Sequence, residues 1–332
     1  MTPSRSTRPV TSPKAPPARR GRLAVDIVIP IYNEAEVFEQ TYRALRKVLE
    51  STRYRYQLYC VNDGSTDATA DVLRRLAAKD PAIKIIELSR NFGHQAALTA
   101  GLSAAQGDIV ITMDADGQHP PELVSKLLSL VRQGYDIVQA QRVEAVEVGA
   151  LKKWTSGGFY RLLNLVSGTP VLPGAADFRA LSRQAVDALN SMPEYHRFLR
   201  GMISWMGFPS ATITYSQPRR TAGRSKYSFA KMFRLAMDAL FSFSLAPLYV
   251  GLTLGGILLC LAVAEMAYVL SFWVTGRTSG LAPGWSSLMF VVLIVGGMLM
   301  VLLGFVGVYV GYIFQEVKRR PVFLAKETRR SE

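Results

Sequence analysis

The sequence of 332 residues predicts an α/β fold with a mostly parallel sheet, followed by a C-terminal hairpin of two transmembrane helices. Short β-rich runs alternate with helical stretches from residue 25 to residue 142. This alternation is typical of a parallel sheet with helices on both faces. Two apolar runs, at about 245–274 and 288–314, each exceed the roughly 20 residues that a helix needs to cross a hydrocarbon core.

The strands and helices of the expected sheet follow one another in regular order. Each strand is a short apolar run, and each helix repeats apolar residues along one face. The expected strands are 25–33, 56–63, 83–89, 108–116 and 135–142. The first helix carries Phe38, Leu45 and Leu49 on its buried face, and further helices are expected at 65–79, 94–105 and 120–134. Ser65 and Thr66 are candidate caps, and Pro120 and Pro121 suit a first helical turn.

Residues 151–234 predict a less regular extension of this domain. A helix is expected at 159–168, and 177–183 reads as a strand leading into a helix. Basic and apolar residues alternate around the segment 225–243. We interpret it as an amphipathic helix on the membrane surface, and packing against the domain is the alternative.

Charge sets the expected domain boundaries and orientation. Basic residues flank both apolar runs, whereas the loop between the runs carries only Arg277. By the positive-inside rule, the flanks lie in the cytosol and the chain is a multi-pass protein of the plasma (inner) membrane. The expected parts are a disordered basic tail (1–22), a cytosolic domain (23–224), the interfacial helix (225–243), a first span (244–275), an external loop (276–286), a second span (287–314) and a cytosolic basic tail (315–332).

Polar residues gather where the expected strands end. In a sheet of parallel strands these carboxyl ends meet at one edge, where ligands bind. The set comprises Asn33, Glu34, Asp63, Arg90, Asn91, Asp114 and Asp116. Their convergence predicts one site rather than scattered surface polarity.

Asp114 and Asp116 stand one residue apart at the end of an apolar run. In an extended chain, residues i and i+2 point to the same side, so the two carboxylates face together while Ala115 points away. Their repulsion is costly unless a cation shares them, and such hard oxygen ligands suit Mg²⁺ or Mn²⁺. Alone, the pair is more typical of a turn with solvated aspartates at the end of a strand, so the metal hypothesis depends on the surrounding motifs.

Those motifs resemble family 2 glycosyltransferases, which are inverting enzymes that use nucleotide sugars. They are IVIPIYNE (27–34), VNDGSTD (61–67), SRNFGHQAALTAG (89–101) and DADGQHPPE (114–122). DFRALSR (177–183) and RTAGRSKYSF (220–229), followed by two apolar runs, narrow the resemblance to the polyprenyl-phosphate glycosyltransferases. These include bactoprenol-phosphate glucosyltransferases, undecaprenyl-phosphate aminoarabinose transferases and dolichyl-phosphate mannose synthases. The resemblance covers about residues 25–325 and implies a nucleotide-sugar-binding, GT-A-like sheet.

The resemblance also implies roles for the residues at matching positions. The expected nucleotide pocket contains Pro30, Tyr32, Glu34, Asp63, Asp114, Ala115 and Gln118. Asp114, Asp116 and Gln118 match the cluster that holds the metal and the diphosphate. The expected contacts to the diphosphate and the lipid phosphate are Arg142, Lys152, Ser156, Arg220 and Lys226. For the basic pair Arg220 and Lys226, simple attraction to the membrane surface is the alternative.

Some positions depart from the family pattern. Asn62 replaces an aspartate, and Gly117 stands where leucine is common. Lys152 replaces an arginine, which keeps the charge but loses bidentate recognition of a phosphate. Gln217 stands where a second arginine is often found, so that contact is not expected.

The expected reaction is transfer of a sugar from a nucleotide sugar, favoured as uridine-linked, to a membrane polyprenyl phosphate. Asp116 and Asp177 are the expected catalytic residues, with Asp177 orienting the acceptor or accepting a proton, or else bonded to backbone at the start of a strand. Homo-oligomers are compatible with the glycine-rich second apolar run. A processive polysaccharide synthase would carry a Gln-x-x-Arg-Trp motif, which is missing, and a non-catalytic membrane scaffold would have lost part of the site. No recognition module for nucleic acid accompanies the pI of about 9.9, so nucleic acid is not an expected partner.

Overall fold

The computed structural model describes residues 23–52, 54–143, 175–216, 246–276 and 284–326. The chain divides into two units, each considered by itself. The first holds the sheet and also includes Pro321–Glu332, and the second holds the two long C-terminal helices. Lys152, Ser156, Arg220 and Lys226 lie outside the described residues, as do the expected tail 1–22, the helix at 159–168 and the interfacial helix at 225–243.

The first unit is built on a seven-stranded sheet of order β3-β2-β1-β4-β6-β5-β7. The strands are β1 Ala24–Ile31, β2 Arg55–Asn62, β3 Ile83–Glu87, β4 Ile109–Thr112, β5 Ile137–Val143, β6 Ala175–Ser182 and β7 Ser210–Ser216. All pairings are parallel except those of β6, which runs antiparallel to β4 and β5. The expected mostly parallel sheet is therefore confirmed, with one reversed strand inside it.

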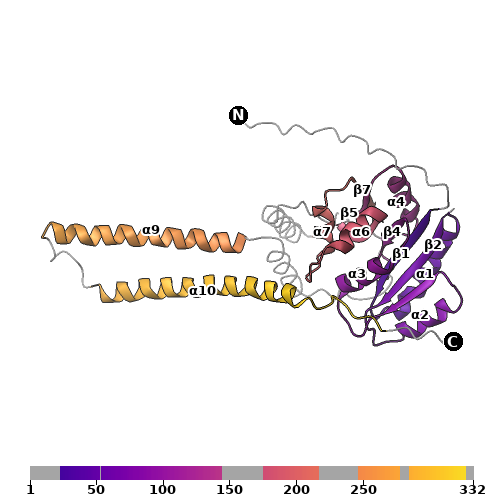
Figure 1. Ribbon diagram of the computed structural model, residues 1–332, viewed down its shortest axis with the longest axis horizontal. Helices are drawn as coiled ribbons and strands as arrows, with labels where there is room; N and C mark the ends of the chain where they lie inside the picture. The colour runs from indigo at the N-terminus through magenta and orange to yellow at the C-terminus, as the bar shows by residue number, and fades with distance from the viewer. Residues whose placement is uncertain (1–22, 53, 144–174, 217–245, 277–283, 327–332) are drawn as a thin grey trace. The chain divides into compact units, whose positions relative to one another are not determined.

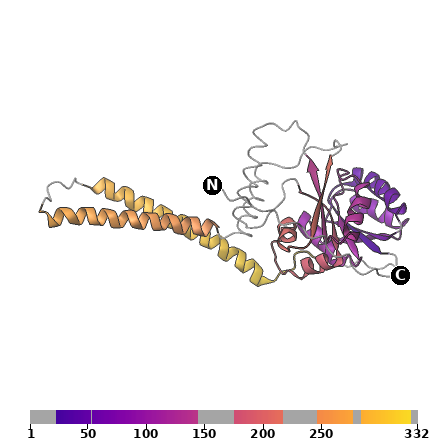
Figure 2. The ribbon, with the colours of Figure 1, turned by 90° about the horizontal axis from the view of Figure 1, so that it is seen from above.

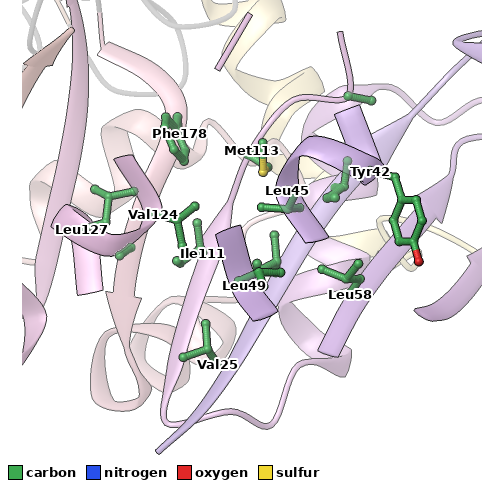
Figure 3. Close-up of a cluster of buried hydrophobic side chains, with 14 of the residues drawn as sticks. Val25, Tyr42, Leu45, Leu49, Leu58, Ile111, Met113, Val124, Leu127 and Phe178 are labelled. Carbon is green, nitrogen blue, oxygen red and sulfur yellow. The ribbon is translucent and has the colours of Figure 1, made fainter. Parts of the chain in front are cut away.

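Helices cover both faces of the sheet, as Figures 1 and 2 show. The helices of this unit are α1 Ala35–Glu50, α2 Thr69–Ala77, α3 His94–Ala104, α4 Leu123–Arg132, α6 Arg183–Ser191 and α7 Leu199–Trp205. On one face, α1, α2 and α4 pack over a core in which Leu45 and Leu49 of α1 and Leu127 of α4 are buried (Figure 3). On the other face, α3 contacts β1, β2 and α6. This layering leaves the carboxyl ends of β1–β4 open for a site.

The α1 face shows why these residues form a helix and a strand together. Val25, Ile27, Ile29 and Ile31 alternate along β1, and all four are buried in the core. Residues of α1 at helical spacing, such as Phe38, Leu45 and Leu49, cover them. Full burial of such a side chain stabilises a fold by about 1.5–3 kcal/mol, so this interface anchors β1 and the loop that follows it.

Helix starts differ from the expected ones in two places. Ser65 and Thr66 do not cap α2, which begins at Thr69; instead the Asp67 carboxylate accepts the Thr69 N–H at 3.0 Å. Pro120 and Pro121 precede α4, which begins at Leu123, rather than lying inside it. Their carbonyls accept the N–H groups of Leu123 and Val124 in turn-type bonds. The prolines thus form the turn that leads from the acid pair into α4.

The second unit contains α9, Ala246–Val274, and α10, Trp285–Lys318, which contact each other. Among the described residues, Ile294–Lys318 is the one segment that meets the length and apolarity of a membrane span. Its large apolar side chains are exposed on the protein, including Leu299, Val301 and Leu303. The helix extends beyond residue 314, where the second span was expected to end.

Candidate active site

Hydrogen bonds join the loop after β1 to the loop after β2. Asn33 has a φ of 54°, an unusual conformation for a residue other than glycine, which asparagine tolerates. Its N–H donates to Ser65 Oγ at 3.1 Å, and its Oδ1 accepts the Thr66 N–H at 2.8 Å. The Glu34 N–H donates to Thr69 Oγ1 at 3.1 Å. These bonds fix the backbone directly after Tyr32, whose side chain is 41% exposed, while Pro30 in β1 is buried.

Asp63 fastens the end of β2 to the loop after β3. Its two carboxylate oxygens accept the N–H groups of Phe92 at 2.7 Å and Gly93 at 3.0 Å. Burial raises the pKa of Asp63, while the two backbone hydrogen bonds oppose that rise. Gly64 follows with a φ of +65°, and a Cβ there would overlap the backbone of Arg90 and Asn91. The close packing of this loop against Asp63 and Gly64 therefore requires glycine at position 64.

The acid pair lies just beyond β4. Asp114 and Asp116 are both partly exposed, whereas Ala115 between them is buried. The Ala115 carbonyl accepts a hydrogen bond from Thr41 Oγ1 at 3.1 Å, and Asp116 Oδ1 accepts the Gln118 N–H at 3.1 Å. This alternation agrees with the expectation that the two carboxylates share one side of the chain.

The buried His119 side chain contacts both the backbone and the carboxylate of Asp114. Its Nδ1 accepts the Asp114 N–H at 3.0 Å, so the proton resides on Nε2, which lies 3.5 Å from Asp114 Oδ2. The imidazole stacks on Phe178, with ring centroids 4.9 Å apart. Burial lowers the pKa of His119 despite the neighbouring aspartates, which favours the neutral imidazole.

Asp177, near the start of β6, is the centre of a buried ion cluster. Its carboxylate pairs with Arg179 Nη2 at 2.5 Å, Arg200 Nη2 at 2.9 Å and His94 Nε2 at 3.1 Å. Burial alone would raise the pKa of Asp177, but Arg200, His94 and Arg179 hold it well below its usual range. A carboxylate held in this way is a poor proton acceptor, and its geometry is that of a positioning group.

His94 connects this cluster to the acid pair. It begins α3, and its Nε2 lies 3.6 Å from Asp114 Oδ1 as well as 3.1 Å from Asp177. Burial would lower the pKa of His94, but the hydrogen bond to Asp177 and the charge of Asp114 raise it overall. The loop after β3, the end of β4 and the start of β6 are thus joined through one imidazole.

Arg142 lies at the same edge of the sheet, on β5. It pairs in register with Tyr215 of β7. Burial raises the pKa of Tyr215 to about 12, and the charges that act on it are those of Arg142, Asp114 and Asp116. Arg142 itself is exposed. An exposed guanidinium whose charge acts on the same tyrosine as the acid pair suits a phosphate contact.

The chemistry of the acid pair fits a divalent cation. Oδ1 of Asp114 is buried and has no hydrogen-bond partner among the described residues. Burial raises the pKa of Asp114, and the nearby charges of Asp177 and Asp116 add to the rise. A hard cation would satisfy this oxygen and relieve the repulsion. The described residues contain no group of three or more metal-binding side chains, so such an ion would take its remaining ligands from water and substrate phosphates.

The structure brings together most of the expected residues that it describes. Asp63, Asp114, Ala115, Asp116 and Gln118 lie on loops joined by the contacts above, and Arg142 faces the same edge. Four residues of the site were not singled out from the sequence: His94, His119, Arg179 and Arg200. Three of the four occur inside quoted motifs (89–101, 114–122 and 177–183), which was the signal available.

Comparisons with known proteins identify the family of the chain. The profile of Glycosyl transferase family 2 matches residues 26–189. The chain is 37% identical, over 92% of its length and 94% of the relative's, to the uncharacterized glycosyltransferase YkcC of Bacillus subtilis (strain 168). It is 34% identical to the SfII prophage-derived bactoprenol glucosyl transferase of Shigella flexneri, over 93% of this chain and 99% of the relative.

A solved structure shows the same fold. The glucosyl-3-phosphoglycerate synthase of Mycobacterium tuberculosis, in complex with Mg²⁺ and UDP, superposes with a TM-score of 0.50 at 20% identity, covering 67% of this chain and 79% of that one. A GT-A-like sheet with an acid pair at its open edge defines a sugar-transferring enzyme, a glycosyltransferase. With relatives this similar along nearly the whole chain, the protein belongs to glycosyl transferase family 2.

Proposed function

We propose that this enzyme transfers a sugar from a uridine-linked nucleotide sugar to the phosphate of a membrane polyprenyl phosphate, such as undecaprenyl phosphate. The observation that carries the proposal is the buried oxygen Oδ1 of Asp114 beside Asp116, which accepts no hydrogen bond from the described residues, at the edge where β1, β2 and β4 end. Support for the acceptor comes from relatives named bactoprenol glucosyl transferase, which match over nearly their full length.

The donor would lie along the loops at the carboxyl ends of β1, β2 and β4. Tyr32 and Asp63 would contact the nucleoside, and Asp114, Asp116 and Gln118 would face its diphosphate. The half-exposed Tyr32 ring offers an apolar surface for the base. Asp63 accepts one N–H per oxygen within the loop, and each carboxylate oxygen has a second lone pair for a base N–H.

The acceptor phosphate can attack without a strong base. Its second pKa is about 6, so its oxygen is largely ionised at neutral pH. That oxygen forms a bond to the anomeric carbon while the bond from this carbon to the diphosphate oxygen breaks, and the electron pair departs with the nucleoside diphosphate. In-line displacement inverts the anomeric configuration. The ion-paired state of Asp177 agrees with such a base-free step.

The difficulty of this reaction is electrostatic, because two phosphorylated molecules must meet. A Mg²⁺ or Mn²⁺ ion held by Asp114 and Asp116 would neutralise charge that develops on the departing diphosphate. Arg142 would contribute a cation from β5, and Lys152, Ser156, Arg220 and Lys226 would add contacts to the lipid phosphate. Preorganised charges of this kind supply the largest share of stabilisation in many enzymes.

The C-terminal helices would keep the enzyme at the surface where its acceptor lies. The segment Ile294–Lys318 has the length and apolarity of a span, and α9 is a helix of 29 residues with a similar composition. We propose that both cross the membrane, with the sheet domain on the cytosolic side. The phosphate of a polyprenyl lipid lies at head-group level, so a domain anchored there reaches it without extracting the lipid.

A transfer assay tests the function directly. Full-length protein in detergent would be incubated with undecaprenyl phosphate, Mn²⁺ and a panel of radiolabelled nucleotide sugars. We expect label to move into the organic phase with one uridine-linked donor and not with the matched Asp116→Asn protein. Should no sugar nucleotide bind in calorimetry, with or without the metal, the proposal would fail.

A further inference from the structure

The chain that follows α10 pairs with the edge of the sheet. We call residues Pro321–Lys326 the C-terminal strap. The Lys326 N–H donates to the Glu87 carbonyl at 2.7 Å, and the Leu324 carbonyl accepts the Ser89 N–H at 2.8 Å. Leu88 and Ala325 form an antiparallel bridge between these bonds. The strap thus prolongs the sheet beside β3, which is its edge strand.

At residues 324–326 the pairing depends on the backbone of the strap, because the side chains there are exposed, whereas Val322 and Phe323 are partly buried. Leu324 is 54% exposed, and Ala325 and Lys326 are exposed. On the sheet side, Leu88 is fully buried, so the segment that receives the strap is firmly part of the core. Replacing an exposed strap side chain should therefore change little, whereas removing a backbone N–H should open the pairing.

The segment held by the strap leads directly into the loop that holds Asp63. Ser89 is followed by residues 90–93, in which Phe92 and Gly93 donate their N–H groups to the Asp63 carboxylate. Gly64 is packed so closely on Arg90 and Asn91 that a Cβ would lie 2.5 Å from the Asn91 nitrogen. Within the loop, the Arg90 guanidinium lies 4.1 Å from the centre of the Phe92 ring. The loop is therefore clamped between the Asp63–Gly64 corner and the strap.

We infer that the C-terminal strap positions residues 90–93, and through them Asp63, for binding of the donor nucleotide. Only Arg319 and Arg320 separate the strap from the end of α10 at Lys318. The strap that positions the expected nucleotide pocket is therefore the chain segment that follows α10 almost directly. This inference rests on the proposed function in taking Asp63 as a nucleotide contact.

The sharpest test replaces one backbone donor. Lys326→Pro removes the N–H that bonds to Glu87, and the matched control Lys326→Ala removes the same side chain but keeps that N–H. Both are made in the full-length protein in detergent. In Lys326→Pro we expect faster amide hydrogen exchange across residues 88–95. We also expect a dissociation constant for UDP that rises by about three- to tenfold, the range of a lost hydrogen bond. Lys326→Ala should match wild type, and the KM for undecaprenyl phosphate should stay constant in both.

Each other outcome has a definite meaning. Equal exchange in the two variants would overturn the inference at its first step, because the strap would not hold the loop. Faster exchange with unchanged UDP affinity would overturn the role in nucleotide binding. If wild type bound no nucleotide at all, the proposed function would fail instead, and the exchange difference would still report on the strap.

A second variant covers the case in which proline unfolds the protein. A stop codon after Arg320 removes the strap entirely, and it should raise exchange at residues 88–95 and weaken UDP binding at least as much as Lys326→Pro. Exchange across α4, which is far along the chain and buried in the core, serves as the internal control for global unfolding. Loss of protection in α4 to the same extent would contradict a local positioning role.

Discussion

Arg200 holds Asp177 at two points, with its Nε 3.1 Å from Oδ1 and its Nη2 2.9 Å from Oδ2. Arg179 Nη2 also donates to Oδ1 of this carboxylate, and His94 Nε2 lies 3.1 Å from its Oδ2. A buried carboxylate surrounded by three donors contributes to stability mainly through its charge, since removing that charge takes the ion pair away from Arg179, whose side chain is buried.

The first prediction concerns this cluster. Asp177→Asn should lower the free energy of unfolding by about 3–5 kcal/mol at neutral pH, the typical cost of breaking a buried ion pair. The control is Asp187→Asn, which breaks the surface pair with Arg183 at 2.9 Å, where Asp187 is 66% exposed, and should cost under about 1 kcal/mol. Thermal unfolding in detergent measures both.

The same variant has a defined pH dependence. Because the pKa of Asp177 is held well below its usual range by Arg200, its contribution is fully present above the ordinary aspartate pKa of about 3.9. It is lost as the pH falls below that value towards the folded pKa. The stability gap between wild type and Asp177→Asn should therefore persist from pH 8 to pH 5 and narrow only in stronger acid. It should widen as the pH falls through the range in which His94 gains its proton, because Asp177 raises the pKa of His94. A gap that closes near pH 6 would contradict the assignment.

The second prediction concerns the acid pair. Asp116→Asn keeps the side-chain shape and the acceptor for the Gln118 N–H, but removes the charge that would hold a cation. We expect kcat to fall on the order of 100-fold or more, because metal-assisted charge stabilisation is worth several kcal/mol. Asp71→Asn, on the exposed side of α2, is the matched control and should transfer sugar normally. Chelation should stop wild-type transfer and Mn²⁺ should restore it; near-normal turnover of Asp116→Asn would remove the metal role.

The third prediction separates a steric requirement from a conformational one. Gly64 and Gly207 have nearly the same positive φ, +65° and +68°, but only at Gly64 would a Cβ overlap neighbouring backbone. Gly207→Ala should cost about 1–2 kcal/mol from the left-handed conformation alone. Gly64→Ala should cost more and should also weaken UDP binding, since it displaces the loop at Arg90. Calorimetry with UDP decides: equal UDP affinity in the two variants would show that the close approach at Gly64 is unimportant.

The fourth prediction concerns His119. His119→Phe keeps an aromatic ring on Phe178 but leaves the Asp114 N–H without its acceptor, at a cost of about 1–3 kcal/mol. Burial lowers the pKa of His119, so the unfolded chain binds a proton that the folded chain does not, and wild type loses stability as the pH falls below about 6.5. The deficit of His119→Phe should therefore shrink between pH 8 and pH 5.5. His119→Asn, which can restore an acceptor, should recover part of the loss.

The alternation of strands and helices was enough to predict the sheet and its ligand-binding edge. Parallel strands joined by helices must end on the same side, so Asp63 and Asp114 could be placed together from their positions in the chain. The direction of strand β6 could not be predicted in this way, because the long connection between β5 and β6 permits either direction. Its direction is what brings Asp177 beside His94, a contact across 83 residues.

Local chemistry explains the remaining differences. Ser65 and Thr66 have the side chains of helix caps, but here they bond to Asn33 in the loop after β1, and the Asp67 carboxylate accepts the first N–H of α2. A short polar side chain can serve either the next helix or a neighbouring loop, and only the folded sheet decides between them. The partners of Asp177 could not be predicted in full either, because Arg200 lies outside every motif that the sequence offered.

The antiparallel pairing of Gln141 with Ala175 places the point where the chain leaves β5 next to the point where it enters β6. A connection whose two ends already meet can be lengthened, shortened or exchanged at little entropic cost. The connection between β5 and β6 could therefore change in length and sequence during evolution while the order of the strands in the sheet stayed the same.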